Sequence, residues 1–234
     1  MTAAERTRIK ICGLTREQDV DAAVAAGADA VGFVMYPGSP RCVSIERAAE
    51  LAARLPVFVT PVLLFVNEAP QQVLACLERL PRALLQFHGD ESPLRCLEST
   101  RGGLHPFMRV ARIPLDGSPF DLLAFAQEHA AARAILLDAH VEGYGGAGKA
   151  FDWSRLPANV PAHLVLSGGL TPASVADGIA QVRPRCRSLA VDVSSGVEAS
   201  KGVKDPEKIH RFVAAVRAAD ALLAKSTNAL LSAT

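Results

Sequence analysis

The sequence predicts a single α/β domain that folds as a (β/α)8 barrel of the TIM type. Eight strand-like apolar runs alternate with helical stretches along the whole chain, without a long linker. The chain has 234 residues, which is close to the ~250 typical of such a barrel. A doubly wound open sheet is the competing architecture, but it usually has fewer strands and binds its ligand at a central switch point.

The strands are predicted where short runs are almost continuously apolar, as expected of strands buried on both faces of a parallel sheet. The predicted strands are 9–12, 30–35, 61–66, 83–88, 108–113, 134–139, 164–166 and 189–193. Helices are predicted over Glu17–Ala26, ending at Gly27, after Ser44, after Asn67 and Pro70, from Ser92-Pro93, over 120–131, near Trp153, from Thr171-Pro172 and over 206–224. The domain is expected to span 1–234, with 225–234 as a C-terminal tail.

Composition narrows the functional class. The net charge is +1 and Lys and Arg are spread along the chain, which argues against nucleic acid or a membrane surface as a partner. No apolar run approaches the ~20 residues that span a bilayer, and the N-terminus lacks the apolar segment of a signal peptide. The five cysteines are scattered without paired metal spacing, so a reduced cytoplasmic protein is expected.

The last two strands end in loops of small residues that suit an anion. Gly168 and Gly169 follow the seventh strand, and Ser194, Ser195 and Gly196 follow the eighth. In (β/α)8 barrels, a phosphate site is commonly formed by the loops after these two strands. The alternative is two tight glycine turns without a ligand, because such turns need glycine anyway.

Cys12 and Asp138 stand at the carboxyl ends of the first and sixth strands, where barrels carry their chemistry. Taken alone, a single cysteine is more often a small buried hydrophobe than a catalyst. An aspartate that ends an apolar strand is either a hydrogen-bonded cap or a working acid. Asp192 lies inside the eighth strand and is expected to orient backbone or neighbouring loops.

The glycine-rich loop at 143–150 (GYGGAGKA) matches two nucleotide-binding patterns only superficially. The dinucleotide pattern G-x-G-x-x-G needs a helix at the glycines and an acidic residue about 20 positions later, and no Asp or Glu lies between Trp153 and Ala176. The G-x-x-x-x-G-K pattern needs Ser or Thr where this chain has Ala150. A mobile lid over a site at the sixth strand is the better interpretation.

Several motifs occur in order along the chain. They are KICGLT at 10–15, GFVMYPGSPR at 32–41, QFHG at 86–89, LD at 137–138 with YGGAGK at 144–149, LSGGL at 166–170 and VDVSSGVE at 191–198. Together they resemble the motif series of the phosphoribosylanthranilate isomerases of tryptophan biosynthesis, over about residues 8 to 215. Several motifs in register are far more specific than any one of them alone.

The resemblance implies the Amadori rearrangement of N-(5′-phosphoribosyl)anthranilate to 1-(2-carboxyphenylamino)-1-deoxyribulose 5-phosphate. It assigns Cys12 as general base and Asp138 as general acid. It places Arg41 near the anthranilate carboxylate, whereas a solvated loop arginine is the alternative without the resemblance. The remaining expected contacts are Gln86, His88, Gly145 and Gly146 with the substrate, and Gly168, Gly169, Ser194, Ser195 and Gly196 with the phosphate. No cofactor and no metal are implied.

The chemistry suits this pair of residues. Ring opening requires protonation of the ribose ring oxygen, which a buried carboxylic acid can supply, and the resulting iminium acidifies the C2′ proton for removal by a thiolate.

Two related barrel enzymes are weaker matches. The isomerase of histidine synthesis uses a pair of aspartates on the first and fifth strands, whereas this chain has Cys12 and no aspartate on the fifth strand. Indole-glycerol-phosphate synthase needs a catalytic lysine pair, which is not apparent here. A catalytically silent barrel would lack Cys12 or Asp138. Broader specificity that includes the histidine-pathway substrate stays open, and the assembly is expected to be a monomer or homodimer.

Overall fold

The computed structural model describes residues 6–140 and 151–232, with the backbone alone at 140 and 226–232. Its described strands include a closed barrel in the order β1 to β8, which confirms the predicted fold class. The barrel strands are β1 (Arg8–Cys12), β2 (Ala30–Val34), β3 (Thr60–Phe65), β4 (Leu84–Phe87), β5 (Phe107–Pro114), β6 (Ala134–His140), β7 (Val160–Leu166) and β8 (Cys186–Val193). Parallel pairing of β1 with β8 closes the barrel.

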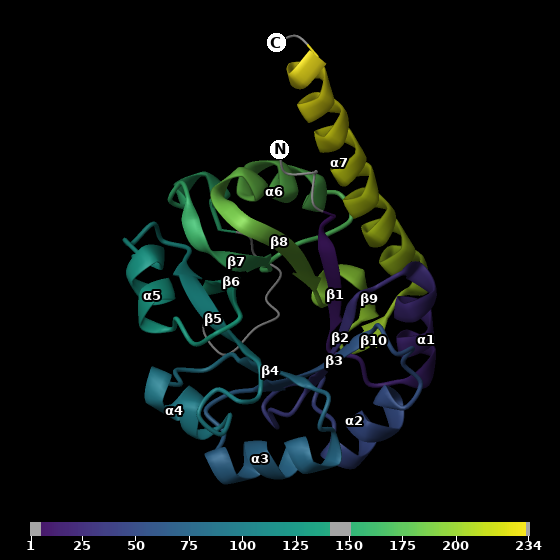
Figure 1. The fold of residues 1–234 in the computed structure, drawn as a ribbon. Helices are drawn as coiled ribbons and strands as arrows, with labels where there is room; N and C mark the ends of the chain where they lie inside the picture. Colours follow the sequence, from purple (N-terminus) through teal and green to yellow (C-terminus); the bar gives the residue numbers. More distant parts are fainter. Residues whose placement is uncertain (1–5, 141–150, 233–234) are drawn as a thin grey trace.

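Helices surround the barrel on its outside, as Figure 1 shows. They are α1 (Glu17–Ala26), α2 (Ile45–Ala52), α3 (Pro70–Arg79), α4 (Pro93–Glu98), α5 (Leu122–Glu128), α6 (Val175–Val182) and α7 (Pro206–Ser232), with the short 3-10 helices η1 (Trp153–Arg155), η2 (Arg183–Arg185) and η3 (Ser195–Val197). An antiparallel hairpin of β9 (Glu198–Ser200) and β10 (Val203–Lys204) follows β8.

The interior of the barrel is filled with side chains. Its centre holds a buried cluster of Val62, Met108, Val110, Leu136 and Val165, which come from β3, β5, β6 and β7. A larger core between the sheet and the helices includes the fully buried rings of Phe33, Phe65, Phe87 and Phe107. Because the centre is packed, a ligand can be held only at an end of the barrel, where the loops are.

The helix signals in the sequence were mostly correct. Ser44 and Ser92 accept hydrogen bonds from the backbone N–H of Arg47 and Arg95, both at 3.2 Å, so they cap α2 and α4 as predicted. The helix predicted from Thr171-Pro172 is assigned only from Val175, three residues later. Thr171 does act as a cap, because its hydroxyl accepts from the N–H of Ser174 while the Ser174 hydroxyl accepts from the N–H of Thr171.

The last helix does not end at residue 224. It continues to Ser232, and Figure 1 shows α7 extending well past the barrel. Its first half is fixed to the barrel by the buried side chains of Ile209, Phe212 and Val216. The predicted packing of the tail stays a prediction, because the side chains of 226–232 and all of 233–234 lie outside the described residues.

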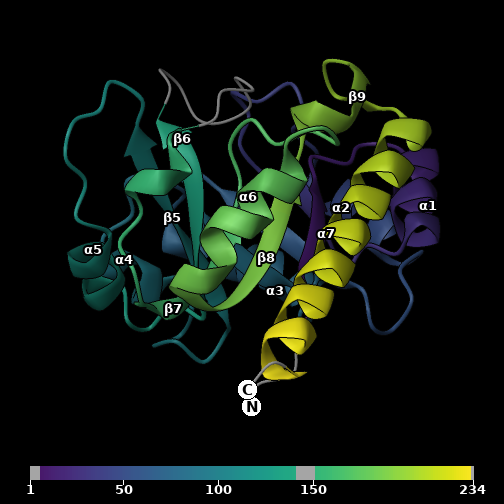
Figure 2. The ribbon, with the colours of Figure 1, turned by 90° about the horizontal axis from the view of Figure 1, so that it is seen from above.

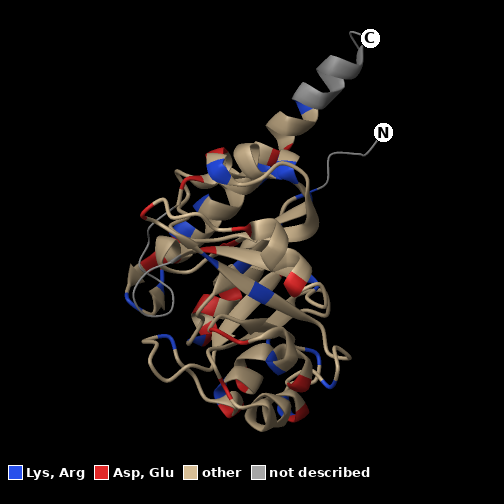
Figure 3. Cartoon of the chain, turned by 90° about the vertical axis from the view of Figure 1, so that its left-hand side faces the viewer, with Lys and Arg blue, Asp and Glu red and all other residues tan. Residues whose placement is uncertain are grey.

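The two ends of the barrel differ in what they carry. Figure 2 shows the end of β6 and the β9 turn at one end, with the last turns of α7 at the other. Lys, Arg, Asp and Glu are interspersed over the side seen in Figure 3. Within the described residues, no helix combines the length and apolarity that crossing a membrane requires.

Candidate active site

Cys12 and Asp138 both face the mouth at the carboxyl end of the barrel. Leu136 belongs to the interior cluster, and side chains alternate along a strand, so Asp138 points inward from the same face of β6. Cys12 packs in the mouth against Val34 and Leu64. Since β1 adjoins β8 and β6 adjoins β7, the two residues flank the loops that follow β7 and β8, as expected.

Gly32 of β2 leaves the space that the Cys12 thiol occupies. A Cβ atom at position 32 would lie 2.7 Å from Cys12 Sγ and 3.2 Å from Lys10 Cε. Lys10 and Cys12 are two residues apart on β1, so their side chains lie on the same face and run together over Gly32. Any larger residue at position 32 would displace the thiol.

A buried ion pair lies beside Cys12. Lys10 Nζ is 2.7 Å from Asp192 Oδ1, and the Ser167 hydroxyl donates to Asp192 Oδ2 at 3.3 Å. Burial disfavours charge on Lys10, but Asp192 outweighs this effect and the pKa of Lys10 is raised. The Asp192 carboxylate therefore pairs with a side chain in the barrel, where sequence reasoning expected it to orient backbone or loops.

Burial and the Asp192 carboxylate raise the pKa of the Cys12 thiol, whereas nearby lysines lower it. The residue is 4 % exposed, and this burial raises the pKa of its thiol above the ordinary value. The ammonium groups of Lys10 and Lys204 favour the thiolate and limit the rise. Cys12 is thus a buried thiol held next to cations, which is the environment that a basic cysteine needs.

Asp138 is held by two donors. Its Oδ1 accepts from the backbone N–H of Ala139 at 2.9 Å, and its Oδ2 lies 3.0 Å from His88 Nε2. His88 Nδ1 lies 3.0 Å from the amide nitrogen of Gln86. The structure therefore joins Gln86 and His88, expected as substrate contacts, to Asp138 in one buried chain.

The loops after β7 and β8 meet closely. A Cβ atom at Gly196 would lie 1.9 Å from the carbonyl oxygen of Leu170, so only glycine allows this approach. Gly168 and Gly169 have φ angles of 78° and 67°, which favour glycine. The first N–H groups of η3, at Ser195 and Gly196, have no partner within that helix.

Ser194 has a different role from its neighbours. Its hydroxyl donates to the carbonyl oxygen of Cys12 at 3.0 Å and accepts from Lys204 Nζ at 3.2 Å. The side chain therefore ties the end of β8 to the end of β1. Any contact of Ser194 with an anion is left to its backbone N–H.

Arg41 is engaged by a carboxylate of the chain itself. Its Nε and Nη2 donate to the two oxygens of Glu198 at 2.7 and 2.8 Å, and Arg41 is only 7 % exposed. Lys204 Nζ donates to Glu198 Oε1 at 2.8 Å. Burial opposes the charge on Glu198, but the hydrogen bonds from Arg41 and Lys204 outweigh it and lower the pKa of Glu198.

Sequence reasoning missed the roles of Glu198, Lys204 and Lys10. A usable signal was present for Lys10, a charged residue inside the apolar run at 9–12, and the structure buries it. The expected contacts Gly145 and Gly146, and the proposed lid at 143–150, lie outside the described residues.

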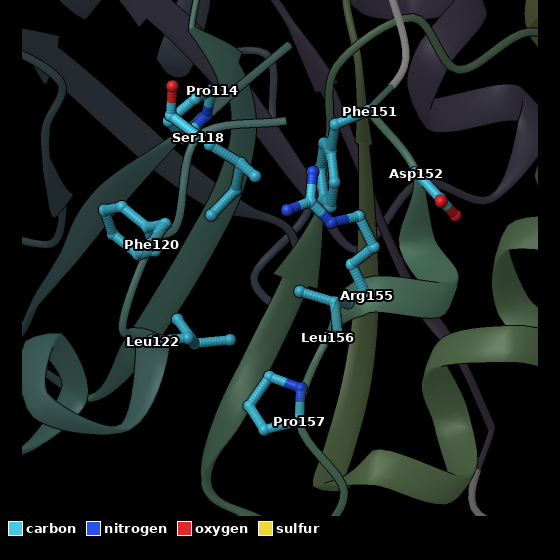
Figure 4. Close-up of a pocket in the computed structure, with 10 residues that line it drawn as sticks. Pro114, Ser118, Phe120, Leu122, Phe151, Asp152, Arg155, Leu156 and Pro157 are labelled. Carbon is cyan, nitrogen blue, oxygen red and sulfur yellow. The ribbon is translucent and has the colours of Figure 1, made fainter. Parts of the chain in front are cut away.

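A separate small cavity lies outside the mouth. It measures about 60 Å³ and lies between the loop after β5 and the segment around η1 (Figure 4). Its lining includes Phe120, Leu122, Phe151 and Pro157, with Arg155 beside them, and Arg155 Nη2 donates to the carbonyl oxygen of Gly117 at 2.6 Å. None of the predicted site residues lines it, so the site is not in this cavity.

Comparisons with known proteins identify the family of the chain. Residues 9–215 match the family model described as N-(5′-phosphoribosyl)anthranilate (PRA) isomerase. A relative named N-(5′-phosphoribosyl)anthranilate isomerase, from Leptothrix cholodnii, is 60 % identical over 216 residues, which cover 92 % of this chain and 93 % of that protein.

Solved structures are similar over nearly their full length. A phosphoribosylanthranilate isomerase in complex with reduced 1-(o-carboxyphenylamino)-1-deoxyribulose 5-phosphate is 35 % identical, with a TM-score of 0.73 and coverage of 91 % of this chain and 99 % of that one. A structure of monomers generated from the dimeric isomerase of Thermotoga maritima gives the same identity, TM-score and coverage. The chain belongs to the N-(5′-phosphoribosyl)anthranilate isomerase family and is an isomerase of tryptophan biosynthesis.

Proposed function

We propose that Cys12 is the general base and Asp138 the general acid of this isomerisation. The observation that carries the proposal is their common position at the mouth, on the two strands that flank the loops after β7 and β8. A phosphate held by those loops would place the sugar between the two side chains. Both side chains are buried and hydrogen-bonded or packed, so they are held ready for the reaction.

The proton transfers follow from the substrate chemistry. Asp138 donates a proton to the ribose ring oxygen while the nitrogen lone pair opens the ring to an iminium. The Cys12 thiolate then removes the acidified C2′ proton, and the resulting enolamine becomes the ketone. Each step needs a proton moved at a fixed atom, which is the task of positioned acid and base groups.

The phosphate is assigned to the backbone of Gly168, Gly169, Ser194, Ser195 and Gly196. Backbone N–H groups in glycine-rich turns form concave anion sites without any side-chain cation. Gly145 and Gly146 stay proposed substrate contacts on the strength of the sequence motif alone.

Arg41 is proposed to bind the anthranilate carboxylate with its remaining edge. Glu198 already occupies Nε and Nη2, which leaves Nη1 and the second hydrogen of Nη2 for a ligand. Glu198, itself held by Lys204, then fixes the plane of the guanidinium on the side away from the ligand. A planar, pre-oriented guanidinium suits a planar carboxylate.

Replacing Arg41 by lysine is expected to raise KM much more than it lowers kcat. Losing a two-pronged charge-assisted contact costs roughly 2 kcal/mol, which corresponds to about 30-fold in KM. Steady-state kinetics on the purified variant measure KM and kcat separately. The exposed Arg82, at the opposite end of the barrel, serves as control through Arg82→Lys. An unchanged KM in Arg41→Lys would remove Arg41 from the binding site.

The activity itself is tested with purified protein and two substrates. Loss of anthranilate fluorescence is expected when N-(5′-phosphoribosyl)anthranilate is supplied. The histidine-pathway aminoaldose substrate tests for broader specificity in a parallel reaction. Turnover of the second substrate alone would overturn the proposed function.

We also propose a homodimer formed through the amino end of the barrel. Phe58 is 94 % exposed and Val57 is 77 % exposed, and both precede β3 at that end. The same end carries a cavity of about 560 Å³, lined by small apolar residues such as Ala126 and Ala130 and by charged ones such as Arg133 and Arg187. In a two-fold dimer, Phe58 of each copy can enter the cavity of the other, which removes the exposed ring from water.

The Phe58→Glu variant is expected to run as a monomer and to keep its kcat, because the active site lies at the other end of the barrel. Light scattering coupled to gel filtration measures the mass. Leu94→Glu, which changes a 66 % exposed leucine at the start of α4, is the matched control and is expected to leave the mass unchanged. A wild-type protein of monomer mass at all concentrations excludes the dimer.

The proposed compartment is the cytoplasm, because its reducing conditions suit a protein with five free thiols.

A further inference from the structure

A buried chain of three side chains crosses the mouth from β4 to β6. Gln86 is fully buried, His88 is 7 % exposed and Asp138 is 8 % exposed. Gln86 and His88 lie two residues apart, so both point into the barrel, and the imidazole reaches past β5 to Asp138. The two contacts on the imidazole ring are both 3.0 Å long.

The amide of Gln86 sets the tautomer of the ring. Its nitrogen can only donate, so His88 Nδ1 accepts from it and the ring proton resides on Nε2. That N–H then donates to Asp138 Oδ2. The other oxygen, Oδ1, lies towards the loop after β7, where a Cβ atom at Gly168 would be 3.0 Å from it.

This orientation of the Gln86 side chain costs free energy at its carbonyl oxygen. Gln86 Oε1 is buried and finds no hydrogen-bond partner among the described residues. A buried polar atom without a partner costs about 1–3 kcal/mol. Such a cost, carried next to an acid at an active site, points to a functional role of the amide orientation.

We propose that Gln86 and His88 are positioning residues for Asp138, a role that rests on the proposed function of Asp138 as general acid. The Nε2–H of His88 anchors Oδ2 and leaves Oδ1 to carry the proton on the phosphate side of the mouth. When that proton passes from Oδ1 to the ribose ring oxygen, the negative charge left on the carboxylate is stabilised by the Nε2–H and by the N–H of Ala139. The imidazole keeps its own proton throughout. Gln86 and His88 thus act through Asp138 and need no contact with the substrate.

The first test compares His88→Leu with His88→Gln. The leucine removes the donor and is expected to lower kcat on the order of 10-fold with KM unchanged, since only the acid step is affected. The glutamine can again present an N–H to Oδ2 and is expected to recover part of the loss. His210→Leu, at an exposed position of α7, is the control. A raised KM with an unchanged kcat in His88→Leu would instead make His88 a substrate contact and overturn the proposal.

The second test determines which ring nitrogens of His88 carry a proton. In wild-type protein with 15N-labelled histidine, the signal of His88, identified among the six histidines by its loss in His88→Gln, is expected to show a protonated Nε2 and an unprotonated Nδ1. Gln86→Glu replaces the donor by an acceptor and is expected to protonate Nδ1 as well. A wild-type ring protonated at Nδ1 contradicts the proposal.

The two proposals fail separately. If Asp138→Asn lowers kcat strongly and adding His88→Leu lowers the residual rate no further, the two residues act as one unit. If the losses multiply, His88 has a role independent of Asp138 and the positioning role is wrong. If Asp138→Asn keeps its activity, the acid assignment fails, whatever the His88 variants show.

Discussion

Cys12→Ala and Asp138→Asn are each expected to lower kcat by at least ~10²-fold, because removing a general acid or base typically costs ~10²–10⁴-fold. Asparagine is nearly isosteric with aspartate and can still accept from His88 through its carbonyl oxygen, although its NH2 group then replaces the oxygen that accepts from Ala139, so the fold and the contact with His88 should survive. Alanine at position 12 removes the thiol but leaves Lys10 paired with Asp192. The loss therefore reports on proton transfer rather than on unfolding.

The pH dependence gives an independent check on Cys12. Burial raises the pKa of the thiol, and the base is the thiolate, so activity is expected to rise with pH from the neutral into the alkaline range. The rise should be absent from the residual activity of Cys12→Ala. Cys186→Ala, at the amino end of β8, is the control for loss of a thiol and should keep the wild-type profile. Near-wild-type kcat in folded Cys12→Ala or Asp138→Asn excludes the assignment.

The barrel and the position of its mouth could be predicted because they depend on local patterns. Apolar runs alternating with helical stretches predict parallel strands, and a parallel barrel brings all carboxyl ends to one mouth. The predicted ends of the strands were less accurate. The structure starts β7 at Val160 and β8 at Cys186, well before the predicted 164 and 189. Polar residues such as His163 and Ser188 interrupt the apolar pattern there, although both lie in the ladder.

The contacts within the site could not be predicted from the sequence, because they depend on strand register. Lys10 meets Asp192 only because the pairing of β1 with β8 places these two residues opposite each other. Arg41 meets Glu198 because the β9–β10 hairpin lies near the loop after β2, where Gly202 approaches the carbonyl oxygen of Pro40. Motif similarity indicated which residues matter, but not which of them touch.

Gly196→Ala is expected to raise KM by at least ~10²-fold. The new Cβ would lie 1.9 Å from the carbonyl oxygen of Leu170, and a backbone atom cannot rotate away as a side chain can. The loops after β7 and β8 must therefore separate, and N–H groups from both loops cannot then reach one phosphate. Two lost charge-assisted hydrogen bonds, at about 1.5–3 kcal/mol each, account for a change of this size.

Inhibition by inorganic phosphate separates the loss of the anion site from general destabilisation. In wild-type protein, phosphate is expected to inhibit competitively, with activity unaffected by EDTA because the proposed site uses backbone N–H groups. In Gly196→Ala the inhibition should disappear.

Gly27→Ala is the matched control. Its φ of 92° makes alanine strained, yet a Cβ there meets nothing within 4 Å, and α1 lies outside the mouth. That variant should melt at a lower temperature with normal KM and normal phosphate inhibition. Ser195→Ala should be mild, since only its backbone N–H is assigned to the anion. Competitive inhibition that persists in folded Gly196→Ala would place the phosphate elsewhere on the barrel.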